Sequence, residues 1–216
     1  MIARLMSKIR SNDAHIYTRI MKAANRIFSR NFHHATVLSP CKLPQTGPAI
    51  VVSNHISSVD PFLIQGTSHR VIRWLMAKEY FDLPVVRTLC GHLGFIPVIR
   101  TGKDAASLKA ALRTLEAGGV LGIFPEGTFS KTQDLLPFQN GVGMIALRTG
   151  APVYPVAIEK IPRDLSVLAA LTVPRSAKIF WGSLLTPSGD SAACTAVFRK
   201  EVQTLQQQTL ATNHVG

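Results

Sequence analysis

One imidazole and one carboxylate stand five residues apart at the end of an apolar run. Residues 49–52 read Ala-Ile-Val-Val, and the polar cluster that follows contains His55 and Asp60. On a straight helix, residues five apart point in directions that differ by roughly 140°. The pair therefore cannot share a helix face. It can converge if His55 lies on the turn after a strand and Asp60 on the first turn of the next helix.

Such a pair fits a general base and the carboxylate that orients it. Asp60 would accept a hydrogen bond from one imidazole nitrogen and leave the other nitrogen free as the base. Ser57 and Ser58 are the nearby candidate nucleophiles, but no G-x-S-x-G motif surrounds them. A base without a protein nucleophile indicates that the substrate brings its own hydroxyl. The alternative is that Asp60 only caps a helix and His55 only occupies a polar turn. We favour catalysis because His55 follows a buried strand.

Two further segments offer groups that could hold an anionic substrate. Arg100 closes the apolar run that begins at Gly94, and a guanidinium can bind phosphate through two parallel hydrogen bonds. A surface salt bridge is the equal alternative.

Residues 124–130 read Phe-Pro-Glu-Gly-Thr-Phe-Ser, where Gly127 permits close backbone approach and Thr128 offers a hydroxyl. Since like charges repel, Glu126 is expected to orient Arg100 or to accept from a substrate hydroxyl. The alternative is an ordinary turn with a surface acid.

The elements that must position these groups alternate between strands and helices. Apolar runs predict strands at residues 49–52, 71–77, 94–99, 120–124, 153–158 and 178–184. Periodicity predicts helices from residue 60, over 79–92 with a break near Pro84, and over 103–117, 141–149 and 191–209. The fold class is therefore α/β, with a mixed, largely parallel sheet covered by helices. Ligands in such sheets bind at the carboxyl ends of strands, where the polar clusters stand. Residues 36–48, rich in proline, read as a connector.

The composition favours anionic partners. The chain has 216 residues, a net charge of +12 and 46% hydrophobic residues, so one α/β domain with a full core is expected. Only 7% of residues are aromatic and no Arg/Gly/aromatic interleaving is present, so we predict no nucleic-acid partner. Three separate cysteines provide no zinc ligand set or disulfide framework, and we predict no metal. No run of 18 apolar residues exists, so we predict no conventional transmembrane helix.

Residues 1–35 form a basic amphipathic unit, and residues 36–216 are predicted to form the α/β domain. Apolar residues at helical spacing are interleaved with seven basic residues against the single acid Asp13. This pattern predicts an N-terminal amphipathic helix pair at an anionic membrane interface. Two alternatives stay open: a helix pair packed on its own domain with a solvated basic face, and an organellar transit peptide.

Four blocks in this order resemble the motifs of the glycerolipid acyltransferases, most closely the 1-acyl-sn-glycerol-3-phosphate acyltransferase (PlsC-like) group. The blocks are Asn54-His55 with Asp60, residues 94–100, residues 124–128 and residues 153–158. The resemblance covers roughly residues 35–190. It implies that His55 activates an acceptor hydroxyl, that Asp60 orients it, and that Arg100, Glu126, Gly127 and Thr128 hold glycerol phosphate, while Pro155 shapes the acceptor or acyl site.

The resemblance also implies the partners and the location of the protein. The acceptor would be a lysophospholipid, the donor acyl-CoA or acyl carrier protein, and no cofactor would be needed. The protein would be membrane-associated, peripheral or monotopic on the cytoplasmic face.

Two departures from the family pattern concern the acceptor. The family often has arginine after the glycine-threonine pair, where this chain has Phe129, and Gln139-Asn140 follow Phe138 where a basic residue is common. Arg100, Lys103 and Lys131 could compensate. Otherwise the acceptor is another lysolipid, for example a lyso-ornithine lipid. A non-catalytic basic lipid-binding protein is the remaining alternative.

Overall fold

The structure is a computed structural model that describes residues 20–100, 104–130, 134–159, 170, 172–174 and 176–211. Residues 20–27 are helical and continue into the π-helix η1 (Phe28–Phe32). The named elements that follow are β1 (Ala35–Ser39), β2 (Ala49–Ser53), α2 (Asp60–Thr67), β3 (Ile72–Ala77), α3 (Lys78–Phe81), α4 (Pro84–His92), β4 (Ile96–Val98), α5 (Ala105–Glu116), β5 (Val120–Ile123), α6 (Gly141–Thr149), β6 (Val153–Glu159), β7 (Ala177–Trp181) and α8 (Ser191–Ala211).

The described strands form one seven-stranded sheet in the order β1-β7-β6-β2-β5-β3-β4. β2 lies at its centre and pairs in parallel with both β5 and β6. The β6–β7 pair is antiparallel, while the other pairs are parallel. The expectation of a mixed, largely parallel sheet covered by helices is confirmed.

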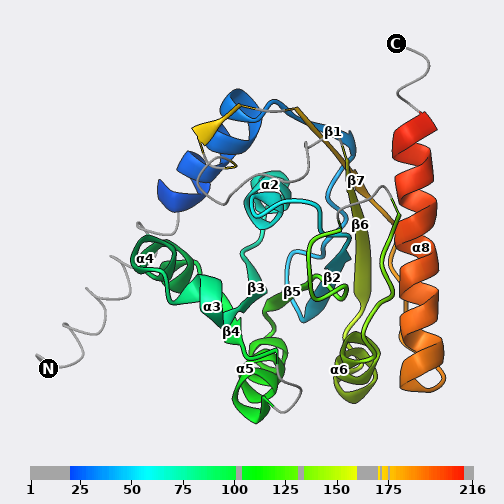
Figure 1. The fold of residues 1–216 in the computed structure, drawn as a ribbon. Coiled ribbons are helices and arrows are strands. Elements are labelled where there is room, and N and C mark those ends of the chain that lie inside the picture. Colours follow the sequence, from blue (N-terminus) through cyan, green and yellow to red (C-terminus); the bar gives the residue numbers. More distant parts are fainter. Residues whose placement is uncertain are drawn as a thin grey trace, which may run out of the picture.

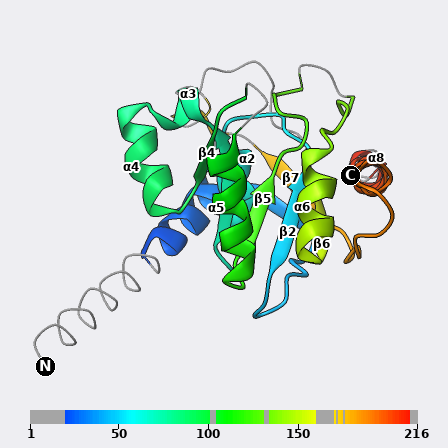
Figure 2. The same ribbon diagram turned by 90° about the horizontal axis from the view of Figure 1, so that it is seen from below.

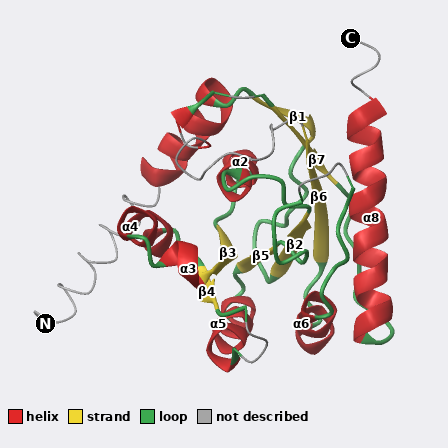
Figure 3. Ribbon diagram, in the orientation of Figure 1, coloured by secondary structure: helices red, strands yellow, loops and turns green. Residues whose placement is uncertain are grey.

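Helices cover both faces of the sheet because alternate strand residues point to opposite faces. Val51, Trp74 and Val156 face a core that contains α2 and Cys90 of α4. Ile50, Leu121 and Val153 face a second core, formed with α5, α6 and α8. Figure 1 and Figure 3 show the strands between these two groups of helices, and Figure 2 shows α5 and α6 side by side on their face. Every residue of β2 is buried, as a central parallel strand requires.

The parallel strands β2, β5, β3 and β4 bring their carboxyl ends to one edge of the sheet. The turns at this edge carry His55 after β2, Phe124 to Ser130 after β5, and Arg100 after β4. Groups that are far apart in the sequence therefore meet at one rim, which is the usual ligand edge of an open α/β sheet.

The prediction that residues 36–48 form only a connector is partly wrong. Residues 35–39 form β1, which pairs in parallel with β7. This edge strand is half-exposed and has the pattern Ala-Thr-Val-Leu-Ser, so it lacks the continuous apolar run that identified the central strands. Its partner comes from the far end of the chain, and sequence periodicity does not reveal such a pairing.

The N-terminal helix pair was predicted over residues 1–35. Most of that segment, residues 1–19, lies outside the described residues, and the division of the chain into residues 1–35 and 36–216 stays a prediction. Over the described part of the chain, no helix is both long and apolar enough to cross a membrane.

Candidate active site

His55 and Asp60 converge as their spacing predicts. β2 ends at Ser53 and α2 begins at Asp60, so the two residues lie on either side of a short turn. Nδ1 of His55 lies 2.8 Å from Oδ2 of Asp60. Asp60 is fully buried, whereas 16% of the His55 side chain is exposed. A neutral imidazole that donates from Nδ1 keeps its lone pair on Nε2, so Nε2 is the nitrogen that can act as a base.

The Asp60 carboxylate does not cap α2, so the alternative that Asp60 only caps this helix is wrong. The N-cap residue is Val59, and no side chain caps the helix. Oδ2 of Asp60 instead accepts from the backbone N–H groups of Ile56 at 2.7 Å and Ser57 at 2.8 Å. The carboxylate therefore stabilises the turn between β2 and α2 through two backbone N–H groups and also orients the imidazole. Oδ1 of Asp60 is buried without a hydrogen-bond partner among the described residues.

Asn54 fixes the strand end from which His55 departs. Its side-chain amide donates to the carbonyl of Ile158 at 2.9 Å and accepts from the N–H of Ile158 at 2.9 Å. The side chain thus replaces the next backbone pair of the β2–β6 ladder. The chain can therefore leave the sheet at His55 while the backbone N–H and C=O of Ile158 in the neighbouring strand keep their hydrogen bonds.

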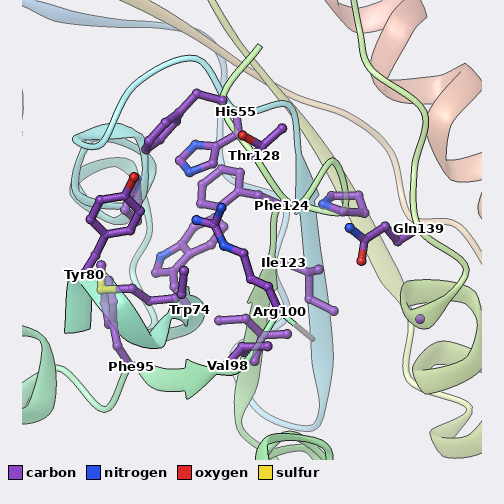
Figure 4. A pocket seen from close by; sticks show the side chains of 18 of the residues that line it. His55, Trp74, Tyr80, Phe95, Val98, Arg100, Ile123, Phe124, Thr128 and Gln139 are labelled. Carbon is purple, nitrogen blue, oxygen red and sulfur yellow. The ribbon is translucent and has the colours of Figure 1, made fainter. Parts of the chain in front are cut away.

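A stack of three rings supports the imidazole. The ring of His55 lies on that of Phe124 with centroids 3.9 Å apart and an interplanar angle of 10°. Phe124 in turn stacks on Trp74 at 4.5 Å. Phe129 contacts His55 from another direction, at 4.4 Å and 52°. Figure 4 shows the rings of Phe124 and Trp74 in order below that of His55. The base is therefore fixed by a carboxylate at its edge and by an aromatic ring at its face.

A cavity of about 390 Å³ opens beside His55. Its walls are mainly apolar and come from both sides of the aromatic stack, with Phe62, Trp74, Met76, Val86, Cys90, Phe95, Val98, Ile123, Val142 and Ile145 among the lining residues. Burial raises the pKa of the Cys90 thiol to about 12, so this cysteine stays protonated and acts as part of the wall. The space suits a hydrocarbon chain that ends at the imidazole.

Arg100 lines the same cavity and also makes an ion pair. Its Nε lies 3.1 Å from Oε1 of Glu79, and both side chains are about half exposed. Its guanidinium carbon lies 5.7 Å from the centre of the Tyr80 ring, and Figure 4 shows the side chain extending toward the ring stack. The structure thus shows the surface ion pair, and the phosphate contact of Arg100 stays a prediction. Lys103 and Lys131, which could compensate for Phe129, lie outside the described residues.

Gly127 and Thr128 also line the cavity. Gly127 has a positive φ of 71°, and a Cβ built there would lie 2.3 Å from Nε2 of Gln139. The backbone conformation therefore favours glycine here, whereas the contact with the flexible end of Gln139 can be relieved by a shift of that side chain.

Glu126 lies behind the imidazole. Its side chain is buried, and Oε1 accepts from the backbone N–H of His55 at 2.7 Å. Oε2 accepts from the N–H of Leu136 at 3.0 Å. Burial raises the pKa of Glu126 to about 7, while these two N–H groups and Arg199 oppose the rise. The contact with Arg100 that we expected does not form, because Arg100 pairs with Glu79.

Pro155 lies apart from the other candidate residues. It is buried in β6, its carbonyl accepts from the N–H of Gly182 at 2.8 Å, and a Cβ on Gly182 would touch its ring. The cavity lining does not include Pro155 among the described residues. Its predicted role at the substrate site stays a prediction.

Sequence reasoning named Asn54 only as part of a motif and did not identify the supporting aromatic residues. An amide at the end of a buried strand was a usable signal, because such a group must satisfy its hydrogen bonds. Trp74 gave no signal, since an aromatic residue in a predicted strand is ordinarily core. The described residues contain no cluster of three or more His, Cys, Asp or Glu side chains that could hold a metal ion.

Comparison with known proteins adds a family to this geometry. A family model described as Acyltransferase matches residues 34–159. The chain is 33% identical over 115 residues to the chloroplastic 1-acyl-sn-glycerol-3-phosphate acyltransferase BAT2 of Brassica napus, covering 51% of this chain and 33% of the relative. It is 30% identical over 118 residues to the 1-acyl-sn-glycerol-3-phosphate acyltransferase of Borreliella burgdorferi, covering 54% of this chain and 47% of the relative. The chain thus spans less than half of the length of each of these two relatives.

A solved structure shares most of the fold. The crystal structure of the 1-acyl-sn-glycerophosphate acyltransferase PlsC from Thermotoga maritima superposes with a TM-score of 0.71 at 25% identity. The match covers 91% of this chain and 83% of the other. The similarity therefore extends over nearly all of the elements that position the candidate site.

Proposed function

The chain belongs to the acyltransferase family, and from that premise we propose that it moves a fatty acyl group from acyl-CoA or acyl carrier protein to the free hydroxyl of a lysophospholipid. The proposed acceptor is 1-acyl-sn-glycerol-3-phosphate, which would give phosphatidic acid. One observation carries the proposal: the His55 imidazole, held through Nδ1 by Asp60, stands at the wall of a mainly apolar cavity.

The proposed reaction is a direct transfer without an acyl-enzyme. Nε2 of His55 takes the proton of the acceptor hydroxyl as the oxygen attacks the thioester carbonyl. An alcohol is far too weak an acid for full deprotonation by imidazole, whose reference pKa is about 6.5, so proton transfer and attack are concerted. As the C–S bond breaks, the imidazolium returns the proton to the leaving sulfur. Asp60 stabilises the imidazolium between these steps.

The acceptor assignment draws on the relatives and on the cavity wall. Both relatives named above are 1-acyl-sn-glycerol-3-phosphate acyltransferases. Arg100 and Thr128 provide a cation and a hydroxyl at the cavity, which suits a phosphate group.

A different lysolipid is the second candidate, and Phe129 favours it. This ring lies 4.4 Å from the imidazole, where an apolar surface replaces the cation that the family often has. The described cation nearest in the lining, Arg100, is already paired with Glu79. An acceptor with a weaker or differently placed anion, for example a lyso-ornithine lipid, would fit this wall.

An acyl-transfer assay with purified protein tests both candidates and the base. The donors are labelled acyl thioesters of CoA and of acyl carrier protein, with acyl chains of several lengths. The acceptors are lysophosphatidic acid, other lysophospholipids and lyso-ornithine lipid. We expect His55→Ala to lose about 10²–10⁴-fold in rate. His69→Ala, an exposed histidine after α2 at the opposite edge of the sheet, is the matched control and should keep full activity.

Three outcomes would decide against parts of the proposal. Wild-type activity in His55→Ala would exclude the proposed base. Acylation of other lysolipids but not of lysophosphatidic acid would replace the leading acceptor with the second candidate. No acylation of any acceptor by a folded protein would favour a lipid-binding protein without activity.

The proposed phosphate contact of Arg100 has its own test. Arg100→Ala should raise the KM for a phosphorylated acceptor and leave the KM for the acyl donor unchanged. Glu79→Gln, which frees Arg100 from its ion pair, should not raise the KM for the acceptor. An unchanged acceptor KM in Arg100→Ala would exclude this role.

Association with an anionic membrane surface completes the proposal. Residues 20–35 contain two exposed isoleucines, Ile20 and Ile27, next to Lys22, Arg26 and Arg30. Apolar side chains flanked by cations suit a membrane interface. The basic segment of residues 1–19 is proposed to extend the same contact, with the protein peripheral or monotopic on the cytoplasmic face.

A further inference from the structure

The backbone of His55 is held on both sides of its residue by the loop that follows β5. The His55 N–H donates to Oε1 of Glu126 at 2.7 Å, and the His55 carbonyl accepts from the N–H of Ser130 at 2.8 Å. The side chain of the same residue is held by Asp60 and stacked on Phe124. Two of these four contacts thus fix the backbone, and the other two fix the ring.

Glu126 stands behind the base and away from the space where substrate can enter. Pro125 and Gly127 on either side of it line the cavity, whereas Glu126 is absent from the described lining. It is only 6% exposed. Both of its carboxylate oxygens accept backbone N–H groups, from His55 and from Leu136. A substrate hydroxyl would have to displace one of these donors to reach the carboxylate.

The second oxygen of Glu126 connects the base to the helix on the far side of the loop. The N–H of Leu136 donates to Glu126, while the carbonyls of Leu135 and Leu136 accept from Arg199 of α8 at 2.7 and 3.2 Å. Arg199 also favours the ionised form of Glu126 through its charge. A chain of hydrogen bonds therefore runs from α8 through the loop and the Glu126 carboxylate to the peptide of His55.

We propose that Glu126 is a positioning residue, which holds the peptide of His55 so that Nε2 meets the acceptor hydroxyl, and that it does not bind the acceptor. The inference rests on the proposed function because it takes His55 as the base. A carboxylate is suited to this role because each of its two oxygens can accept one N–H group. An amide side chain of the same shape has one acceptor oxygen and must lose one of the two contacts.

Two substitutions test the proposal by steady-state kinetics. Glu126→Ala should lower kcat about 10- to 100-fold, because a small displacement of a reacting group is enough for such a loss. The KM for the acceptor should stay within about twofold of the wild-type value, since a group that acts only on the base changes kcat alone. The kcat of Glu126→Gln should lie between that of the wild type and that of Glu126→Ala. Glu116→Gln, an exposed glutamate at the end of α5, is the control and should change neither constant.

A spectroscopic measurement tests the contact without any activity. In full-length protein labelled with ¹⁵N-histidine, the backbone amide of His55 is identified by its absence from His55→Ala. Its proton resonance should move upfield in Glu126→Gln and Glu126→Ala, because the charged acceptor is lost, and it should stay in place in Glu116→Gln. This result holds even if the proposed reaction is wrong, so the two failures are distinguishable.

Two results would overturn the inference. The first is an acceptor KM that rises about tenfold or more at unchanged kcat, which would place Glu126 in contact with the acceptor. The second is a His55 amide resonance that stays in place in both variants. If Glu126→Ala does not fold, Glu126→Gln alone decides by the same two measurements.

Discussion

At the scale of single residues, Asp60 serves two roles through a single oxygen atom. One oxygen, Oδ2, accepts from the imidazole of His55 and from the N–H groups of Ile56 and Ser57. The same atom therefore shapes the turn and orients the base. The spacing of His55 and Asp60 predicted the second task, and only the coordinates showed the first.

We expect Asp60→Asn to affect both activity and stability. The rate should fall about 10²–10⁴-fold, because the amide cannot stabilise an imidazolium. The free energy of unfolding should fall by about 1–3 kcal/mol, because a buried donor loses a charged acceptor. Enzyme assays and urea unfolding measure the two effects. Asp82→Asn, which breaks only an exposed pair with Lys78, should change neither. Retention of full activity in Asp60→Asn would contradict the role assigned to Asp60.

Glu126 gives the free energy of unfolding a pH dependence. Burial and then the charge of Asp60 raise the pKa of Glu126 from 4.5 to about 7. Between these two values the folded state binds the proton more tightly than the unfolded state, so its contribution to stability is complete below pH 4.5 and is lost as the pH rises toward 7. Each pH unit changes the free energy by about 1.4 kcal/mol, and the total is on the order of 3 kcal/mol.

Urea unfolding of wild type and Glu126→Gln from pH 4.5 to 8 isolates this contribution. The difference in unfolding free energy between the two proteins should change steadily up to about pH 7 and then stay level. Other ionising groups titrate in both proteins, so they cancel in the difference. A difference that is constant over the whole range would show that Glu126 ionises normally.

At the scale of elements, a glycine in β5 makes room for the ring stack. Trp74 of β3 lies against Gly122 of β5, and a Cβ at Gly122 would come within 2.4 Å of the indole ring. The indole then supports Phe124, which supports His55. The absence of a side chain at Gly122 thus leaves the space in which Trp74 supports Phe124 and, through it, the imidazole of His55.

Gly122→Ala should therefore damage the site from a distance. The added methyl group must displace Trp74, and overpacking of this kind costs about 1–3 kcal/mol. Thermal unfolding should show the loss, while a fall in kcat and altered tryptophan fluorescence should accompany it. Gly91→Ala in α4 is the control, because a Cβ at Gly91 meets nothing within 4 Å. The explanation fails if Gly122→Ala keeps both the stability and the kcat of wild type.

At the scale of the whole molecule, the positive charge is proposed to direct the protein to anionic lipid. The net charge is +12, and the first 19 residues contain four basic residues and one acidic residue. The helix from residue 20 is fastened to the domain, since Asn25 and Ser29 both donate to the carbonyl of Phe62. A deletion that stops before residue 20 therefore removes charge without removing these contacts.

Deletion of residues 1–19 should weaken binding to anionic vesicles. Each basic residue near such a surface contributes about 1 kcal/mol, so a net loss of three charges should reduce partitioning on the order of 100-fold. Vesicle sedimentation with anionic and neutral lipid measures the effect, and activity on a short-chain, water-soluble acceptor should persist. Equal binding of both proteins to anionic vesicles would assign the membrane contact to another surface.

The sequence by itself determined the alternation of strands and helices and the pairing of His55 with Asp60. Both are local: periodicity reports the face that an element buries, and a spacing of five residues restricts where two side chains can meet. The central strands were predicted from their apolar runs. The helix over residues 141–149 was predicted with the bounds that α6 has, and it ends at Gly150, which adopts a φ of 63°.

Only the tertiary structure decided what stands around the pair. It assigned β1 to the sheet edge beside β7, directed the Asp60 carboxylate toward the N–H groups of the turn before α2, and directed Glu126 toward the backbone of His55 instead of Arg100. The physical reason is common to these cases. Each depends on which strands become neighbours, because neighbouring strands bring distant loops within hydrogen-bond reach, and sequence periodicity carries no information about that choice.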